Sequence, residues 1–164
     1  MVIWIIGKSG SGKSFISKFL KKTLKTKNNK LVWIDGDKFR KKFSKDLGFS
    51  FSDRKKNSKR IQNYCKKFDR MGYIVICSIL SIFRDHQRQN RKIFSKYMQI
   101  YIDVNLDILK LRNNKKIYSK KKNIVGKDIK FPVPYNSDLV IKNDFTIKFL
   151  KNVQLIKKKI YAKI

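Results

Sequence analysis

The feature that most constrains this chain is a glycine-rich segment close to its start. Residues 7–14 read GKSGSGKS and match the pattern GxxxxGK[ST] at every fixed position. A continuous apolar run over 2–6 precedes the segment, as is typical of a strand buried on both faces of a parallel sheet. Apolar residues at helical spacing follow over 13–24. The pattern therefore predicts a phosphate-binding loop, called the phosphate loop below, between a buried strand and a helix.

Each residue type in the phosphate loop has a chemical reason to be there. Backbone N–H groups of a glycine-rich turn can point at phosphate oxygens, and the dipole of the following helix reinforces them. Lys13 is expected to reach the β- and γ-phosphates, and Ser14 to ligate Mg²⁺ through its hydroxyl. The loop thus predicts ATP with Mg²⁺ as the phosphoryl donor. The residues expected to contact it are Gly7, Lys8, Ser9, Gly10, Ser11, Gly12, Lys13 and Ser14.

The rest of the chain alternates between strand-like and helix-like segments. Further strands are predicted over 31–34, 73–77, 98–102 and 139–141. Helices are predicted over 52–71 with Ser52 as the N-cap, over 84–96, from 106 onward, and over 145–161. Such alternation predicts one α/β domain over 1–164, with a mostly parallel five-stranded sheet and helices on both faces. Ligands of these sheets bind beyond the carboxyl ends of the strands.

Three polar clusters follow predicted strands, over 7–14, 35–40 and 78–84, and the second suits an anionic acceptor. In the segment Asp35–Arg40, carboxylates can hold an acceptor hydroxyl or order Mg²⁺-bound water, while Arg40 can grip an anionic group in a bidentate way. Phe49 can stack on a base. Arg54 and Asn57 lie three residues apart on one predicted helix, so both can face the same ligand. The guanine-specific NKxD motif of GTPases is not matched, since 114–116 lacks the aspartate.

Three segments together resemble the adenylylsulfate kinase (APS kinase) family. They read DGDKFR over 35–40, LGFSFSDRKKN over 47–57 and SILSIFR over 78–84, in the family's order and at similar spacing. The resemblance runs from residue 2 to about residue 141. It implies a three-layer P-loop kinase fold and transfer of the γ-phosphoryl group of ATP to the 3′-hydroxyl of adenylyl sulfate in sulfate activation. It also implies a small-molecule nucleotide partner and a homodimer.

The resemblance implies roles for individual residues. Asp35 and Asp37 match paired acceptor-site aspartates, with Asp35 positioning Mg²⁺ and the hydroxyl. Phe49 matches the phenylalanine that stacks on the acceptor adenine. Ser81 matches a serine often described as a phosphoserine intermediate, although direct in-line transfer needs none. The lid, about 112–134, would close over both nucleotides. Further matched positions are Arg40, Ser50, Arg54, Asn57, Leu80, Lys115 and Phe131 on the acceptor side, and Arg112 on the ATP side.

Two segments depart from the family pattern and leave the acceptor open. The lid lacks the family's aspartate and glycine at 113 and 116, and the loop 126–134 lacks its glutamate. The family's Ile-Ser-Pro reads Leu80-Ser81-Ile82. A second reading is therefore a kinase for the 3′-hydroxyl of another activated nucleotide, such as cytidine diphosphoramidate.

The composition of the chain gives expectations about its binding partners and its cellular compartment. The net charge of +31 raises a third reading, a nucleic-acid-binding module. The lysines occur in every segment, however, so solvated basic faces are expected rather than a specific nucleic-acid site. No apolar stretch is long enough for a membrane span, and no leader is recognised, so a cytoplasmic protein is expected. Cys65 and Cys77 are expected as reduced, partly buried thiols, and His86 on an exposed helix.

Overall fold

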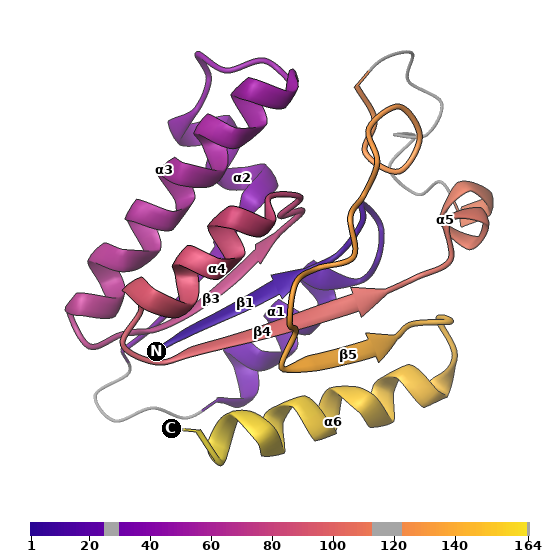
Figure 1. Ribbon diagram of the computed structural model, residues 1–164. Coiled ribbons are helices and arrows are strands. Elements are labelled where there is room, and N and C mark those ends of the chain that lie inside the picture. Colours follow the sequence, from indigo (N-terminus) through magenta and orange to yellow (C-terminus); the bar gives the residue numbers. More distant parts are fainter. Residues whose placement is uncertain (25–29, 113–122, 164) are drawn as a thin grey trace.

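The computed structural model describes residues 1–24, 30–112 and 123–163 (Figure 1). Strands and helices alternate along most of the chain. In order they are β1 (Val2–Ile6), α1 (Lys13–Thr23), β2 (Leu31–Asp35), α2 (Gly36–Phe43), α3 (Phe51–Arg70), β3 (Ile74–Ile79), α4 (Arg84–Ile93), β4 (Tyr97–Asp103), α5 (Leu106–Arg112), β5 (Leu139–Lys142) and α6 (Ile147–Tyr161).

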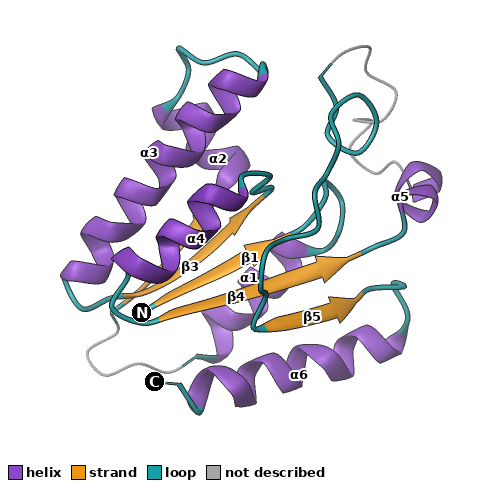
Figure 2. Ribbon diagram, in the orientation of Figure 1, coloured by secondary structure: helices purple, strands orange, loops and turns teal. Residues whose placement is uncertain are grey.

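The five strands form one sheet in the order β2-β3-β1-β4-β5, and every pairing is parallel. Helices α1 and α6 cover one face, and α3 and α4 cover the other (Figure 2). The α/β architecture predicted from the sequence is confirmed. All strands point the same way, so the turns that follow β1, β2, β3 and β4 meet at one edge.

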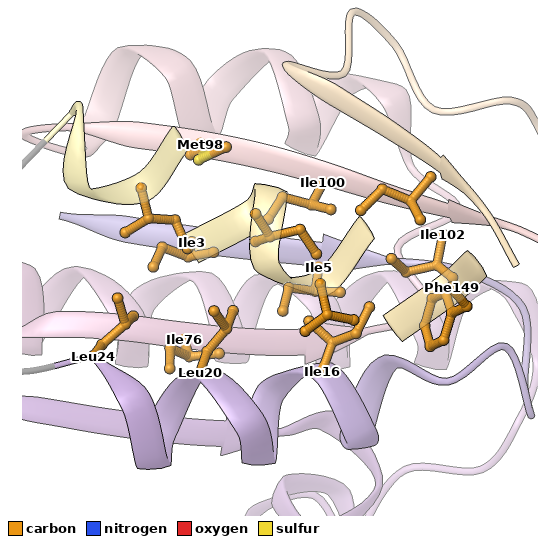
Figure 3. Close-up of a cluster of buried hydrophobic side chains, with 14 of the residues drawn as sticks. Ile3, Ile5, Ile16, Leu20, Leu24, Ile76, Met98, Ile100, Ile102 and Phe149 are labelled. Carbon is orange, nitrogen blue, oxygen red and sulfur yellow. The ribbon is translucent and has the colours of Figure 1, made fainter. Parts of the chain in front are cut away.

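Strand β1 lies in the middle of the sheet. Its side chains point alternately to the two faces, so they contribute to two separate parts of the core. Ile3 and Ile5 pack with residues of α1 and α6 (Figure 3). Trp4 points to the opposite face, toward Ile61 and Cys65 of α3. All of β1 is fully buried, and each buried isoleucine side chain contributes about 1.5–3 kcal/mol relative to an exposed one. This anchoring holds the phosphate loop at the end of a rigid strand.

Helix α2 and the start of α3 differ from the sequence-based prediction. Asp35 caps α2 by accepting from the backbone N–H groups of Asp37 and Lys38, so the segment 36–43, where no helix was predicted, is helical. The N-cap of α3 is Ser50 rather than Ser52, because the Ser50 hydroxyl accepts from Asp53 N–H at 3.1 Å. No helix within 1–24, 30–112 and 123–163 is long and apolar enough to cross a membrane.

The prediction of an exposed His86 is wrong. Its side chain lies on the inner face of α4, 5% exposed, with Nδ1 2.9 Å from the Ser58 hydroxyl of α3. Burial lowers the pKa of His86, so the ring is neutral near pH 7 and joins the two helices as a core residue. The cysteine prediction is confirmed, since Cys65 and Cys77 are free and buried.

The contacts of Asp138, just before β5, predict how the stability of the fold depends on pH. It accepts from Gln99 N–H at 2.7 Å and pairs with Arg91 at 3.1 Å and Lys163 at 3.0 Å. Burial opposes ionisation, but these donors outweigh it and hold the pKa of Asp138 below its usual value. The carboxylate therefore stabilises the fold above about pH 4. This contribution is lost as the pH falls through the folded-state pKa.

Replacing Asp138 by asparagine should lower the free energy of unfolding by about 2 kcal/mol at pH 7. The difference from wild type should shrink at acidic pH, where the wild-type carboxyl also becomes neutral. Urea unfolding at both pH values measures it, with D107N on the exposed side of α5 as control. An equal difference at both pH values would contradict the assigned role.

Candidate active site

The phosphate loop has the backbone conformation that its glycines were predicted to allow. Gly10 and Gly12 have φ of 80° and 95°, in the left-handed region that other residues adopt only with strain. At Gly7 a side chain would come within 2.9 Å of the Ile102 carbonyl oxygen. Lys13 Nζ folds back over the loop and donates to the carbonyls of Gly7 at 2.8 Å and Lys8 at 2.7 Å. The ammonium thus lies against the first two residues of the loop.

Asn143 supports this loop and was not found from the sequence. It follows β5 and is 3% exposed. Its side-chain Nδ2 donates to the Ser11 carbonyl at 3.0 Å, and its backbone N–H donates to the Asp103 carbonyl at 2.8 Å. In a single sequence, one asparagine after a strand does not indicate that it contacts the phosphate loop. Only the packing of β5 next to β4 brings it to the loop.

Asp35 is the centre of the polar contacts at the edge of the sheet. Its Oδ2 accepts from the Ser14 hydroxyl at 2.9 Å, while Oδ1 is held by the first turn of α2. Two hard oxygen donors at this separation fit one edge of an octahedral Mg²⁺ site, whose neighbouring ligands lie roughly 3 Å apart. The residues present therefore suit Mg²⁺, and binding of the ion by Ser14 and Asp35 stays a prediction.

Three acceptor-side residues form a stack that we call the Phe49 clamp, made of Arg40, Phe49 and Arg54. The guanidinium carbons of Arg40 and Arg54 lie 4.6 and 5.4 Å from the centre of the Phe49 ring. Arg40 donates to the Gly48 carbonyl, and Arg54 donates to the carbonyls of Phe49 at 3.0 Å and Asn123 at 2.8 Å. The ring itself is 59% exposed. The clamp places an exposed aromatic ring beside two cations.

The electrostatics of the clamp favour an anion. Burial lowers the pKa of both guanidinium groups, and the charge of Arg40 lowers the pKa of Arg54 further. Asp37 and Asp53 oppose the shift at Arg40. Among the described residues, Arg40 Nε and Asn57 Oδ1 are buried with no hydrogen-bond partner. A ligand with both negative charge and hydrogen-bonding groups would satisfy the clamp and Asn57 together.

Ser81 lies in a different environment from Asp35 and Lys13. Its side chain is 4% exposed, and its hydroxyl accepts from the Trp4 indole N–H at 3.2 Å. The backbone is in the left-handed region with φ of 47°, and Gln87 Nε2 donates to the Ser81 carbonyl at 2.9 Å. These contacts shape the turn after β3. A catalytic or substrate contact for Ser81 stays a prediction.

The remaining predicted site residues lie around this edge. Lys8 Nζ donates to the Val104 carbonyl at 2.8 Å and lies 5.6 Å from the centre of the Phe131 ring. Arg112 stacks on Phe145, with the guanidinium carbon 4.0 Å from the ring centre. Leu80 is half-buried and packs beside Phe83. The hydroxyl of Ser50 is engaged as the cap of α3. Lys115 and the part of the predicted lid over 113–122 fall outside the described residues.

Comparisons with known proteins agree with this arrangement. The family model for adenylylsulphate kinase matches residues 1–142. The chain is 35% identical over 147 residues to an adenylyl-sulfate kinase of Bacillus velezensis, covering 85% of this chain and 75% of that protein. It is 36% identical over 148 residues to an adenylyl-sulfate kinase of Prochlorococcus marinus, covering 86% and 74%.

A solved structure gives the same result. It is the APS kinase of Mycobacterium tuberculosis in complex with AMPPNP and APS, with a TM-score of 0.81 and 26% identity. The match covers 95% of this chain and 96% of that one. The phosphate loop, Asp35 and the Phe49 clamp thus lie in a fold and a sequence that match the same enzymes. The chain belongs to the adenylylsulphate kinase family.

Proposed function

We propose that this protein transfers the γ-phosphoryl group of ATP to the 3′-hydroxyl of adenylyl sulfate. The observation that carries the proposal is the position of Asp35. Its carboxylate contacts Ser14 of the phosphate loop at 2.9 Å and begins the helix that carries Arg40 of the Phe49 clamp. One carboxylate therefore joins the donor side to the acceptor side. The named relatives are adenylyl-sulfate kinases, which supports the choice of acceptor.

The donor side positions and neutralises the triphosphate. Backbone N–H groups of the phosphate loop and the α1 N-terminus hold phosphate oxygens. Lys13 moves from the loop carbonyls to the transferring phosphoryl group, where its charge stabilises the transition state. Ser14 and Asp35 would hold Mg²⁺, which would offset the negative charge of the triphosphate when bound.

The acceptor side supplies recognition of a base and an anion. Phe49 offers a face on which the adenine stacks, and Arg40 and Arg54 hold the charged end of the nucleotide. Asn57 Oδ1 can accept a hydrogen bond from the bound nucleotide. Asp35 orients the 3′-hydroxyl toward the γ-phosphorus, and direct in-line transfer follows without a phosphoenzyme.

An assay with two acceptors tests the proposal. The protein is incubated with ATP and Mg²⁺ and either adenylyl sulfate or a cytidine diphosphate conjugate, and ADP and the 3′-phosphorylated product are measured. Turnover with adenylyl sulfate is expected. Turnover with the cytidine compound alone would reject adenylyl sulfate as the acceptor but would retain ATP-dependent phosphoryl transfer as the reaction. Salt-sensitive binding to oligonucleotides without any turnover would overturn the kinase assignment.

Arg40 should affect the acceptor and not the donor. Replacing it by alanine removes one side of the Phe49 clamp, so the KM for the acceptor should rise roughly 10–100-fold. The KM for ATP should stay within about twofold, because phosphate contacts come from the other side of Asp35. Steady-state kinetics with each substrate varied measure this. K41A on the exposed face of α2 is the control, and equal loss of ATP binding in R40A would contradict the role.

We also propose that the protein works as a homodimer in the cytoplasm, as the family resemblance implies. Light scattering of the purified protein at several concentrations tests the dimer. A monomer with full activity would reject it. Fractionation of cells tests the compartment independently of the assembly.

A further inference from the structure

The pairing of β2 with β3 brings three polar side chains to the same face of the sheet. Ser78 lies directly opposite Asp35 in the parallel register. Trp33 lies two residues before Asp35 on β2, so both point to the same side. The three side chains therefore meet beside the phosphate loop. Trp33 lies outside the motifs of this chain, and Ser78 is the first residue of the segment over 78–84 but has no role assigned by it.

We call Trp33, Ser78 and Asp35 the row, and the hydrogen bonds along it have a defined direction. The Trp33 indole N–H is a donor only, and it donates to the Ser78 hydroxyl oxygen at 3.1 Å. The hydrogen of that hydroxyl is then available to Asp35, whose Oδ2 lies 3.5 Å away. Ser78 is 3% exposed, so little water competes for either bond. Lys38 Nζ lies 5.6 Å from the Trp33 ring centre and helps to hold the indole in place.

We propose that Ser78, oriented by Trp33, is a positioning residue that sets the angle of the Asp35 carboxylate. Oδ1 is held by the first turn of α2, whereas Oδ2 is shared between the hydroxyls of Ser14 and Ser78. If the Ser14 hydroxyl were to ligate a metal ion, the Ser78 hydroxyl would still hold Oδ2 in place. The inference rests on the proposed function and deepens it, because it concerns how Asp35 is held for the acceptor hydroxyl and Mg²⁺.

A double-mutant cycle of S78A and W33F tests the row in the full chain. Kinetics are measured with the acceptor that wild type turns over, adenylyl sulfate or the cytidine conjugate. S78A should lower kcat roughly 3–10-fold, because a misaligned carboxylate affects the reaction more than binding. The KM for ATP and for the acceptor should stay within about twofold. W33F should have a smaller effect in the same direction.

The double variant distinguishes a relay from two separate packing defects. Because Trp33 acts through Ser78, S78A/W33F should be no slower than S78A. S78T restores a hydroxyl and should recover most of the lost rate. S44A is a matched control, since Ser44 is 1% exposed and its hydroxyl has no partner among the described residues. Additive losses, or a change confined to the melting temperature, would overturn the proposal.

A readout without turnover keeps this inference separate from the proposed function. The chain has two tryptophans, so the indole N–H signals in a ¹⁵N–¹H spectrum number two, and W33F assigns them. S78A should shift the Trp33 signal and leave that of Trp4 unchanged. An unmoved Trp33 signal would reject the row even in an active enzyme. Wild type that phosphorylates neither acceptor would reject the proposed function, and the spectrum would then decide on the row alone.

Discussion

Replacing Lys13 by alanine should lower kcat by roughly 10³-fold or more with any acceptor. The ammonium lies against the carbonyls of Gly7 and Lys8 in the phosphate loop. It is therefore positioned to meet charge that develops on the transferring phosphoryl group. A neutral side chain leaves that charge to the backbone N–H groups. Single-turnover measurements at saturating ATP report the loss in the chemical step.

The control for this variant lies on the same helix. Lys18 is exposed on α1, one turn farther from the loop, so K18A changes the net charge equally and should keep full activity. K13A should also keep the wild-type melting temperature within a few degrees. A K13A protein that turns over at a tenth of the wild-type rate would show that the loop backbone alone stabilises the transition state.

Replacing Asp35 by asparagine should lower kcat by roughly 10²–10³-fold while leaving the protein folded. Asparagine is as good an N-cap as aspartate, so the first turn of α2 should persist. The change removes the negative charge beside Ser14, and with it the favourable site for Mg²⁺ and for the acceptor hydroxyl. Activity should become dependent on higher Mg²⁺ concentration. A titration of rate against Mg²⁺ at fixed ATP measures both effects.

D107N serves as the matched control for D35N. Asp107 lies in the first turn of α5 and is exposed, so neutralising it removes one charge without touching the site. It should leave kcat and the Mg²⁺ dependence unchanged. D35N with a normal rate but a raised acceptor KM would assign Asp35 to binding alone.

Much of the fold could be predicted because the apolar pattern is unambiguous. The run over 2–6 contains no polar residue and is followed directly by a glycine-rich loop, which is typical of a strand buried on both faces in an α/β protein. The residue types of the phosphate loop require one backbone conformation, and Gly10 and Gly12 have it. Neither conclusion depends on distant contacts, so the sequence near each residue was sufficient.

The parts that could not be predicted depend on tertiary contacts. Helix α2 is short and polar on most sides, and it forms because Asp35 caps it at the end of a strand. His86 carries no local signal of burial, and only the packing of α4 against Ser58 removes it from solvent. Asn143 meets Ser11 across more than a hundred residues of sequence. Side-chain direction at Ser81 follows from a left-handed backbone that its residue type does not indicate.

The two guanidinium groups of the Phe49 clamp have a consequence for how this protein behaves in solution. Both positive charges lie beside the same ring, and each makes a further positive charge nearby less favourable. Any small oxyanion that enters relieves this repulsion. Sulfate and phosphate buffers therefore compete with the acceptor for the same groups. An acceptor affinity measured in such buffers would describe displacement of the buffer ion, whereas chloride or a bulky organic anion would leave the clamp free to report binding itself.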